Sequence, residues 1–294
     1  MTRSLHQFIE NIATRLATCC VHEREATQEA WLILEKVMDT TRTNLLSMAS
    51  IALTPAQQKR LDFLVEQRVV HHQPLAYLLG SVPFCDLDIL VEPPILIPRP
   101  ETEEWVTWLI EQLKCVQPER FTILDLCTGS GCIALALAHA FPLATVIGVD
   151  NNPHALALAN KNKKHLNIAN ATFMCGDLFA ALPHDFTCDL IVANPPYITE
   201  NEYHQLQPEV AQWEDKNALV ASNHGLDFYQ RIAQNAGRYL TAHSLFVSRD
   251  LPRISLEVGL SPESVVAICR DAGFNRCELH CDMQGSPRWA VVRI

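Results

Sequence analysis

ILDLCTGSGCIALALA, residues 123–138, is the stretch that decides the fold. It begins as an apolar strand, which we expect to end at Asp125, and runs through a turn with Gly129 and Gly131 into an alanine-rich helix. Glycines let the backbone approach a ligand closely, and the first turn of a helix offers unpaired N–H groups. Many such turns carry two glycines for geometry alone, so this turn leaves a nucleotide-like ligand and a purely structural role equally open.

The alternation of strand and helix continues along the chain. FTILDL precedes GCIALALAHAF, TVIGVD precedes PHALALANKNKKHL, and ATFMCGD and DLIVAN add two further strands. Strands separated by helices of this length predict a parallel, doubly wound sheet and an α/β fold. The carboxyl ends of parallel strands share one edge, where open sheets bind ligands.

The N-terminal part of the chain has a different pattern. Apolar residues recur at helical spacing within residues 23–39, and Thr54 with Pro55 has the composition of a helix start. The alternation within residues 87–91 then predicts a strand or hairpin that acts as a connector. We therefore expect three parts: an all-helical domain over 1–83, a β-hairpin linker over 84–96 and a larger α/β domain over 97–294.

Length and charge limit the classes of function. The 294 residues are 48% hydrophobic, enough for two domains that each bury a core. The 23 basic and 33 acidic residues give a net charge of −10, which argues against a nucleic-acid-binding face. We expect no signal peptide and no membrane span, since the N-terminus lacks an apolar core and no apolar run reaches about twenty residues.

The cysteines indicate a reducing compartment. They number 11, an odd count, and form no CxxC pair. This usage predicts free thiols and a cytoplasmic location. Cys277, His280 and Cys281 could hold a metal ion, but no second cluster accompanies them in the sequence, so we expect no metal.

Acidic residues follow the next two strands. Asp150 ends TVIGVD, where a carboxylate can accept both ribose hydroxyls of a nucleotide or cap the following helix. Asp177 follows ATFMCG and could accept from an adenine amino group, with Leu178 or Phe179 against the ring. These strand ends predict a site for an adenosine compound. NAD and S-adenosylmethionine both qualify, and the CTGSG turn, which is not GxGxxG, separates them only weakly.

The fourth strand decides between them, because it runs into Asn194, Pro195, Pro196 and Tyr197. Proline cannot donate to a sheet ladder, so the strand stops here. A planar NH₂ group has two hydrogens, which the Asn194 side-chain oxygen and the Pro195 carbonyl can accept while Tyr197 lies on its face. Such acceptors orient the nitrogen and return electron density to it, so we expect no catalytic acid or base. The alternative is a proline-rich loop with Asn as a turn former.

NPPY at this position resembles the amino-methyltransferases that use S-adenosylmethionine. A longer ordered set narrows the resemblance: QPLAYLLG at 73–80, LIPRPETE at 96–103, ILDLCTGSGCIALALA, VDNNPHALALAN and ANPPYI. Together these motifs resemble the HemK/PrmC family, the protein-(glutamine-N5) methyltransferases that act on peptide chain release factors. The resemblance spans roughly residues 70–235, and the N-terminal region agrees in type more than in sequence.

The resemblance implies a fold and a substrate. The fold would be a Rossmann-like class I methyltransferase domain with a seven-stranded mixed sheet, joined through a β-hairpin to a small N-terminal helical domain that docks the substrate. The substrate would be the glutamine of the Gly-Gly-Gln motif in class 1 peptide chain release factors, with S-adenosylmethionine as the methyl donor.

The resemblance also assigns residues by match to the motifs. The cofactor positions would be Cys127, Thr128, Gly129, Ser130, Gly131, Asp150, Asn151, Asp177, Leu178 and Asn194. The catalytic positions would be Asn194, Pro195 and Tyr197. The substrate positions would be Asn194, Pro195, Pro196, Tyr197, Arg99 and Glu101.

Two departures from the family pattern leave alternatives open. Cys127 stands where the family usually has glycine, and the residues from 240 to 259 lack its Pro-Gly-Gly turn. A cysteine that requires positive φ would be strained. The alternatives are an amino-methyltransferase acting on adenine, cytosine or guanine in nucleic acid, a ribosomal-protein glutamine methyltransferase, and a binding protein that has lost its cofactor through Cys127.

Overall fold

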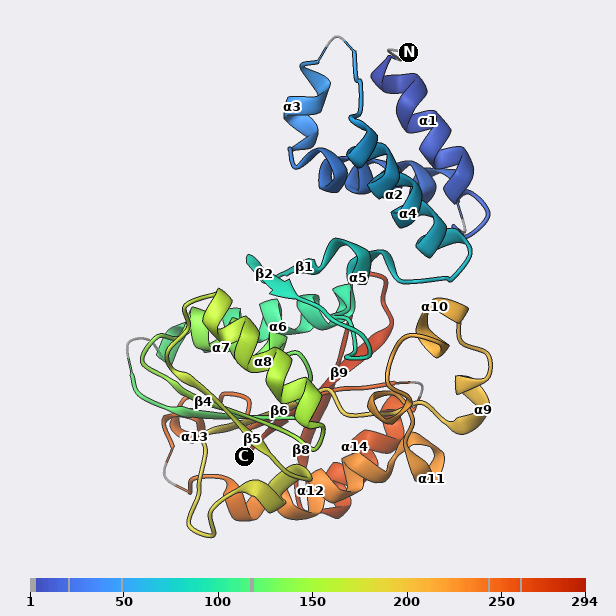
Figure 1. Ribbon diagram of the computed structural model, residues 1–294. Coiled ribbons are helices and arrows are strands. Elements are labelled where there is room, and N and C mark those ends of the chain that lie inside the picture. The colour runs from blue at the N-terminus through green and yellow to red at the C-terminus, as the bar shows by residue number, and fades with distance from the viewer. Residues whose placement is uncertain (1–3, 21, 49, 117–118, 243, 260) are drawn as a thin grey trace. The chain divides into compact units, whose positions relative to one another are not determined.

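The computed structural model describes residues 4–20, 22–48, 50–116, 119–242, 244–259 and 261–294 (Figure 1). The chain divides into two compact units. The first comprises Met1–Ser81 with Gln207–Trp213, and the second comprises Val82–Leu206 with Glu214–Ile294. In the described part of the chain, no helix has the length and apolar character needed to cross a membrane.

The first unit is built from helices. They are α1 (Leu5–Leu16), α2 (Glu23–Met38), α3 (Arg42–Leu46), α4 (Pro55–Val69), α5 (Leu75–Leu79) and α10 (Pro208–Ala211). Thr54 caps α4 as predicted, because its hydroxyl accepts from the Gln57 N–H while the Gln57 side chain accepts from the Thr54 N–H. Leucine, isoleucine and valine side chains of α1, α2 and α4 form the buried core of this unit.

A buried ion pair ties α10 into this unit. The Arg68 guanidinium on α4 donates to Glu29 on α2, with Nε–Oε2 at 2.9 Å and Nη2–Oε1 at 2.8 Å. Its Nη1 donates to Glu209 on α10, and Trp213 Nε1 donates to the His71 carbonyl at 2.9 Å. The segment Gln207–Trp213 therefore belongs to the helical unit although its neighbours in sequence belong to the second.

The second unit contains two sheets. The hairpin sheet pairs β1 (Ser81–Phe84) with β2 (Leu87–Leu90). The large sheet has the order β5-β4-β3-β6-β7-β9-β8. Its strands are β3 (Thr122–Leu126), β4 (Thr145–Asp150), β5 (Ala171–Cys175), β6 (Leu190–Ala193), β7 (Ile254–Glu257), β8 (Arg276–Cys281) and β9 (Pro287–Arg293). β9 runs antiparallel to both of its neighbours, β7 and β8, and the other paired strands of this sheet run parallel, so the predicted seven-stranded mixed sheet is confirmed.

Helices cover both faces of the large sheet. The α-helices of this unit are α6 (Pro100–Leu113), α7 (Cys132–Ala140), α8 (Pro153–His165), α9 (Glu200–Tyr203), α11 (Ser222–Gly225), α12 (Asp227–Tyr239), α13 (Leu245–Ser248) and α14 (Pro262–Asp271). Residues of α6 and α7 share one core with Ile123 and Val192, and residues of α12 and α14 share the other with Leu124 and Ile191. Successive strand residues thus face opposite cores, as the pleat of a strand requires.

Asn162 on α8 links the hairpin to the glycine-containing turn. It is fully buried; its Oδ1 accepts from the Leu90 N–H at 2.7 Å, and its Nδ2 donates to the carbonyls of Leu90 and Ser130, each at 3.0 Å. One side chain therefore satisfies backbone groups from two segments that are distant in sequence.

Replacing Asn162 with alanine removes these three hydrogen bonds and leaves buried backbone groups without partners. We expect the free energy of unfolding to fall by about 2–4 kcal/mol, measured by urea denaturation. Asn160→Ala, which removes a bond to Leu156 within the same helix, serves as control and should cost less than about 1 kcal/mol. Equal losses in the two variants would contradict the linking role of Asn162.

Candidate functional site

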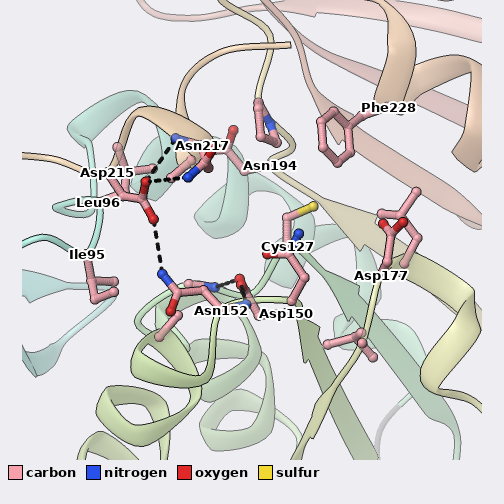
Figure 2. A pocket seen from close by; sticks show the side chains of 18 residues that line it. Ile95, Leu96, Cys127, Asp150, Asn152, Asp177, Asn194, Asp215, Asn217 and Phe228 are labelled. Atoms are coloured by element: carbon pink, nitrogen blue, oxygen red, sulfur yellow. Dashed lines mark hydrogen bonds between the residues drawn. The ribbon is translucent and has the colours of Figure 1, made fainter. Parts of the chain in front are cut away.

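A pocket opens at the carboxyl ends of β3, β4 and β6, where the strand order of the sheet reverses. Open α/β sheets bind ligands at this point. The empty volume is about 670 Å³, part of it open to solvent. Its lining combines carboxylates and amides with apolar side chains, among them Leu96, Leu178 and Phe228 (Figure 2).

The glycine-containing turn forms one wall with its backbone in an unusual conformation. Cys127, Gly129 and Gly131 have φ of 60°, 55° and 82°. The left-handed region costs a non-glycine residue about 1–2 kcal/mol, so Cys127 is strained where glycine would not be. At Gly131 a Cβ would lie 3.0 Å from Ala159 Cβ and from Phe173 Cζ, so this glycine permits close packing.

A buried carboxyl group supports the turn from below. Asp125 was expected to end its strand, but β3 continues to Leu126, and Asp125 is fully buried. Thr128 Oγ1 donates to Asp125 Oδ2 at 2.5 Å, which turns the Thr128 side chain toward the sheet. Burial raises the pKa of Asp125 to about 7, with a further increase from Asp150, against the lowering effect of hydrogen bonds from Thr128 and Ala134.

Asp150 at the end of β4 closes the turn. Its Oδ2 accepts from the Gly129 N–H at 2.8 Å and its Oδ1 from the Asn152 N–H at 2.9 Å. Burial raises its pKa, which these N–H groups oppose. The helix cap is Asn152, whose side chain accepts from the His154 N–H. Asp150 therefore faces the pocket with its carboxylate oriented by two N–H donors.

The third strand end supplies a mixed wall. Asp177 lines the pocket, and its Oδ2 accepts from Arg231 Nη2 at 2.5 Å. Leu178 also lines the pocket and has φ of 50°. Phe179 does not line it: its ring stacks on Tyr239 with centroids 4.6 Å apart. The ring that lines the pocket is Phe228, which sequence reasoning missed.

The NPPY residues divide between two cavities. Asn194 and Pro196 line the pocket, whereas Pro195 is buried and Tyr197 lines a neighbouring cavity with Tyr229 and Gly259. Asn194 Nδ2 donates to Thr102 Oγ1 at 3.3 Å. This leaves Asn194 Oδ1 as an acceptor for a ligand, since no other described residue donates to it.

Two glycines leave the space that Tyr197 occupies. A Cβ on Gly259 would lie 2.4 Å from Tyr197 Cδ2, and one on Gly225 would lie 2.2 Å from the Tyr197 carbonyl oxygen. The Tyr197 N–H donates to the Leu219 carbonyl at 3.2 Å. Burial raises the pKa of the Tyr197 phenol, which stays neutral.

A segment after the NPPY residues closes the side of the pocket. Asp215 Oδ2 accepts from Asn152 Nδ2 at 3.1 Å, and its Oδ1 accepts from the backbone and the side chain of Asn217 (Figure 2). Next to Asp215, the buried Glu214 accepts from Arg99 Nη2 at 2.5 Å. Arg99 thus supports this segment and is not part of the pocket lining.

The predicted residues fall into two groups. Those that line the pocket are Cys127, Gly129, Asp150, Asn151, Asp177, Leu178, Asn194 and Pro196. Those that do not are Thr128, Ser130, Gly131, Pro195, Tyr197, Arg99 and Glu101. The lining residues that sequence reasoning missed are Ile95, Leu96, Val149, Asn152, Ala155, Gly176, Asp215, Asn217, Ala218 and Phe228. Of these, Asn152 carried a signal, because it precedes Pro153 at a helix start.

One group with the geometry of metal ligands occurs among the described residues, and it lies outside this site. Cys19, Cys20 and Glu29 place their ligand atoms within 4.8 Å of one another. Glu29 is already paired with Arg68 through both carboxylate oxygens. Burial raises the pKa of Cys20 to about 12, which disfavours the thiolate that a metal requires.

The mixed sheet and the pocket over its reversal point define the chain as a class I methyltransferase of Rossmann-like fold. The family described as "Methyltransferase small domain" matches residues 106–212, and that described as "PrmC N-terminal domain" matches residues 8–80. The chain belongs to the release factor glutamine methyltransferase family, as the following relatives show.

Three relatives carry the name "Release factor glutamine methyltransferase". The Thermodesulfovibrio yellowstonii protein is 37% identical over 82% of this chain and 83% of its own length. The Coxiella burnetii protein is 34% identical over 99% of each chain, and the Escherichia coli K12 protein is 36% identical over 84% of this chain and 89% of its own.

A solved structure shows the same fold. The hMettl16 catalytic domain in complex with MAT2A 3'UTR hairpin 6 aligns with a TM-score of 0.54 at 16% identity, over 81% of each chain. At this identity the likeness concerns the fold alone.

The buried Asp125 makes stability depend on pH. Its folded-state pKa of about 7 lies above the ordinary value of 3.8, so the unfolded chain ionises first and stability is lost as pH rises from about 4 to 7. We expect Asp125→Asn to remove this loss. The thermal midpoint of the variant, minus that of the wild type, should increase between pH 5 and pH 8 in calorimetry. The exposed Asp185→Asn should show a constant difference, and a constant difference for Asp125→Asn would refute the assignment.

Proposed function

We propose that this protein transfers a methyl group from S-adenosylmethionine to the side-chain amide nitrogen of the glutamine in the Gly-Gly-Gln motif of class 1 peptide chain release factors. The observation that carries the proposal is Asn194. Asn194 lines the pocket and its NH₂ group donates to Thr102, and its oxygen, to which no described residue donates, remains available as an acceptor. An amide NH₂ is the kind of group that such an oxygen can receive.

The residues present fit an adenosine compound. Asp150 is held by two N–H donors in a position to accept ribose hydroxyls. Leu178 and Phe228 offer apolar surface for a purine ring, and Gly129 leaves its surroundings open, since a Cβ there would meet nothing within 4 Å.

The NPPY residues would perform the chemistry by orientation. S-adenosylmethionine, when bound, would supply an electrophilic methyl group on a sulfonium. Transfer to the amide nitrogen would break the methyl–sulfur bond and leave S-adenosylhomocysteine, and the nitrogen would lose one proton to solvent after transfer. Asn194 Oδ1 would accept one amide hydrogen of the substrate. We assign the other hydrogen to the carbonyl of Pro195, a buried residue next to the lining residues Asn194 and Pro196. Two acceptors would fix the nitrogen and increase its electron density. Tyr197 remains a neutral phenol and acts through its shape and its ring.

We assign the docking of the protein substrate to the N-terminal helical domain predicted over residues 1–83, of which residues 8–80 match the PrmC N-terminal domain. The net charge of −10 supports a protein substrate over a nucleic acid. All 11 cysteines are free, which supports a cytoplasmic location together with the release factors.

The proposal is tested by methyl transfer from labelled S-adenosylmethionine to a purified class 1 release factor. The matched control is the same factor with the Gly-Gly-Gln glutamine changed to alanine, and DNA, RNA and ribosomal proteins are assayed in parallel. Label on the intact factor alone supports the proposal. Label on nucleic acid or on a ribosomal protein, and not on the release factor, would refute the proposal and identify the labelled molecule as the substrate.

Asn194→Ala should reduce the rate of methyl transfer by about 10²–10³-fold, because it removes an acceptor that orients the reacting nitrogen. The dissociation constant for S-adenosylmethionine, from calorimetry, should change less than about 10-fold, since Asp150 and the turn retain their contacts. A variant with unchanged methyl transfer would contradict the role of Asn194.

Gly259→Ala should reduce methyl transfer by at least about 10-fold, because its Cβ would lie 2.4 Å from the Tyr197 ring and displace it. Cofactor affinity should be preserved, since Tyr197 does not line the pocket. Gly237→Ala on α12 is the control, because a Cβ there meets only Phe274 at 3.9 Å. The control should keep full activity and gain about 0.5–1 kcal/mol of stability; an equal loss in both variants would exclude the role of Gly259.

A further inference from the structure

Two buried side chains behind the pocket form a relay to Asn194. Asn194 Nδ2 donates to Thr102 Oγ1 at 3.3 Å, and Thr102 Oγ1 donates to Glu257 Oε2 at 2.6 Å. Thr102 and Glu257 are only 2% and 3% exposed. They come from different elements: Thr102 from the first turn of α6 and Glu257 from the end of β7.

The fold brings these elements together by several contacts. β6 and β7 pair in parallel with Ala193 opposite Leu256. Asn194 follows Ala193 and Glu257 follows Leu256, so these two residues lie at the ends of adjacent strands. Trp105 Nε1 donates to Ser255 Oγ at 2.8 Å and fixes α6 against β7. The Tyr229 hydroxyl donates to the Glu257 carbonyl at 2.9 Å. The relay is thus held from α6, β7 and α12.

The direction of the hydrogen bonds follows from the donors available. A carboxylate only accepts, so the single hydroxyl hydrogen of Thr102 is committed to Glu257. Thr102 Oγ1 can then only accept, and it must receive the Asn194 NH₂ group. The two ends of an amide have nearly the same shape, so packing alone would not distinguish them. The carboxylate does, because it forces Asn194 Oδ1 away from Thr102.

We propose that Thr102 and Glu257 are positioning residues that select the amide orientation of Asn194 and thereby make its oxygen, and not its NH₂ group, the partner of the substrate. This role rests on the proposed function, because only a substrate that offers an NH₂ group requires an acceptor here. Neither residue lines the pocket, so neither is a catalytic residue.

The relay depends on the charge of Glu257. Burial raises the pKa of Glu257 to about 7, with a smaller increase from Glu101 and with opposing effects of the Thr102 hydrogen bond, Arg288 and Arg99. The phenols of Tyr197 and Tyr229 also face this carboxyl; burial raises the pKa of each, so both stay neutral. A protonated Glu257 can donate to Thr102, which then loses its fixed direction. Activity should therefore fall as pH decreases through about 7.

The test compares four variants with the wild type in single-turnover methyl transfer to a release factor between pH 6 and 9. Thr102→Val should lower the rate about 10–100-fold with unchanged cofactor affinity and release-factor KM. Thr102→Ser, which keeps the hydroxyl, should stay within about 3-fold of the wild type. Glu257→Gln should flatten the acid limb of the pH profile, whereas the exposed Glu263→Gln should keep it. Burial also raises the pKa of Asp125 to about 7. The fall in activity at low pH is therefore assigned to Glu257 only if it disappears in Glu257→Gln.

A second measurement does not depend on catalysis. In NMR spectra of the full chain, the Asn194 side-chain amide signal should shift with pH with a midpoint near 7, and the shift should vanish in Glu257→Gln and Thr102→Val. The positioning role would be refuted if the chemical shift of the Asn194 amide did not change with pH. It would also be refuted if Thr102→Ser lowered the rate of methyl transfer as much as Thr102→Val. Absence of methyl transfer by the wild type, with the Asn194 titration intact, would instead refute the proposed function and leave the relay standing.

Discussion

The parallel pairing of β6 between β3 and β7 is the constraint on which the site depends. It places the ends of three strands side by side, with Leu126 opposite Ala193 and Ala193 opposite Leu256. Asn194 follows β6 directly, and Glu257 is the last residue of the neighbouring β7. Pro195 and Pro196 cannot extend that ladder, so the chain must leave the sheet directly after Asn194.

Support for the site comes from residues that never reach the pocket. Asn162 ties the hairpin to the glycine-containing turn, and Asp125 holds Thr128 away from the ligand side. Gly225 and Gly259 provide the space that Tyr197 occupies. Positional accuracy of this kind matters for catalysis by orientation, because a small displacement of the reacting group is costly in rate.

Local sequence signals predicted the elements and the strand-end residues, and failed where the contact is distant in sequence. The strands, the Thr54 cap and the positions of Asp150 and Asn194 follow from periodicity and from proline and glycine chemistry. Phe228, Asp215 and Glu257 carry no such signal. They reach the site because α12, the segment after NPPY and β7 lie next to it in the fold. Contacts between residues that are distant in sequence leave no local pattern that a single sequence could reveal.

Two buried carboxyl groups, Asp125 and Glu257, stand beneath the site, and both are shifted by burial toward pKa values of about 7. A folded core gains nothing from such groups in isolation, since desolvation of a carboxylate is unfavourable. Each accepts a hydrogen bond from one threonine hydroxyl: Thr128 within the glycine-containing turn donates to Asp125, and Thr102, which also accepts from Asn194, donates to Glu257. A buried carboxyl group paired with a threonine hydroxyl therefore occurs twice beneath the site, and at Thr102 the hydroxyl oxygen also accepts from a third residue, Asn194. A hydroxyl whose single hydrogen is donated to a buried carboxylate can only accept from its other neighbours. At Thr102 this neighbour is Asn194, so the Asn194 amide must present its NH₂ group to Thr102. Desolvation of the two carboxyl groups lowers stability, but it leaves the donors and acceptors of the pocket oriented before a ligand binds.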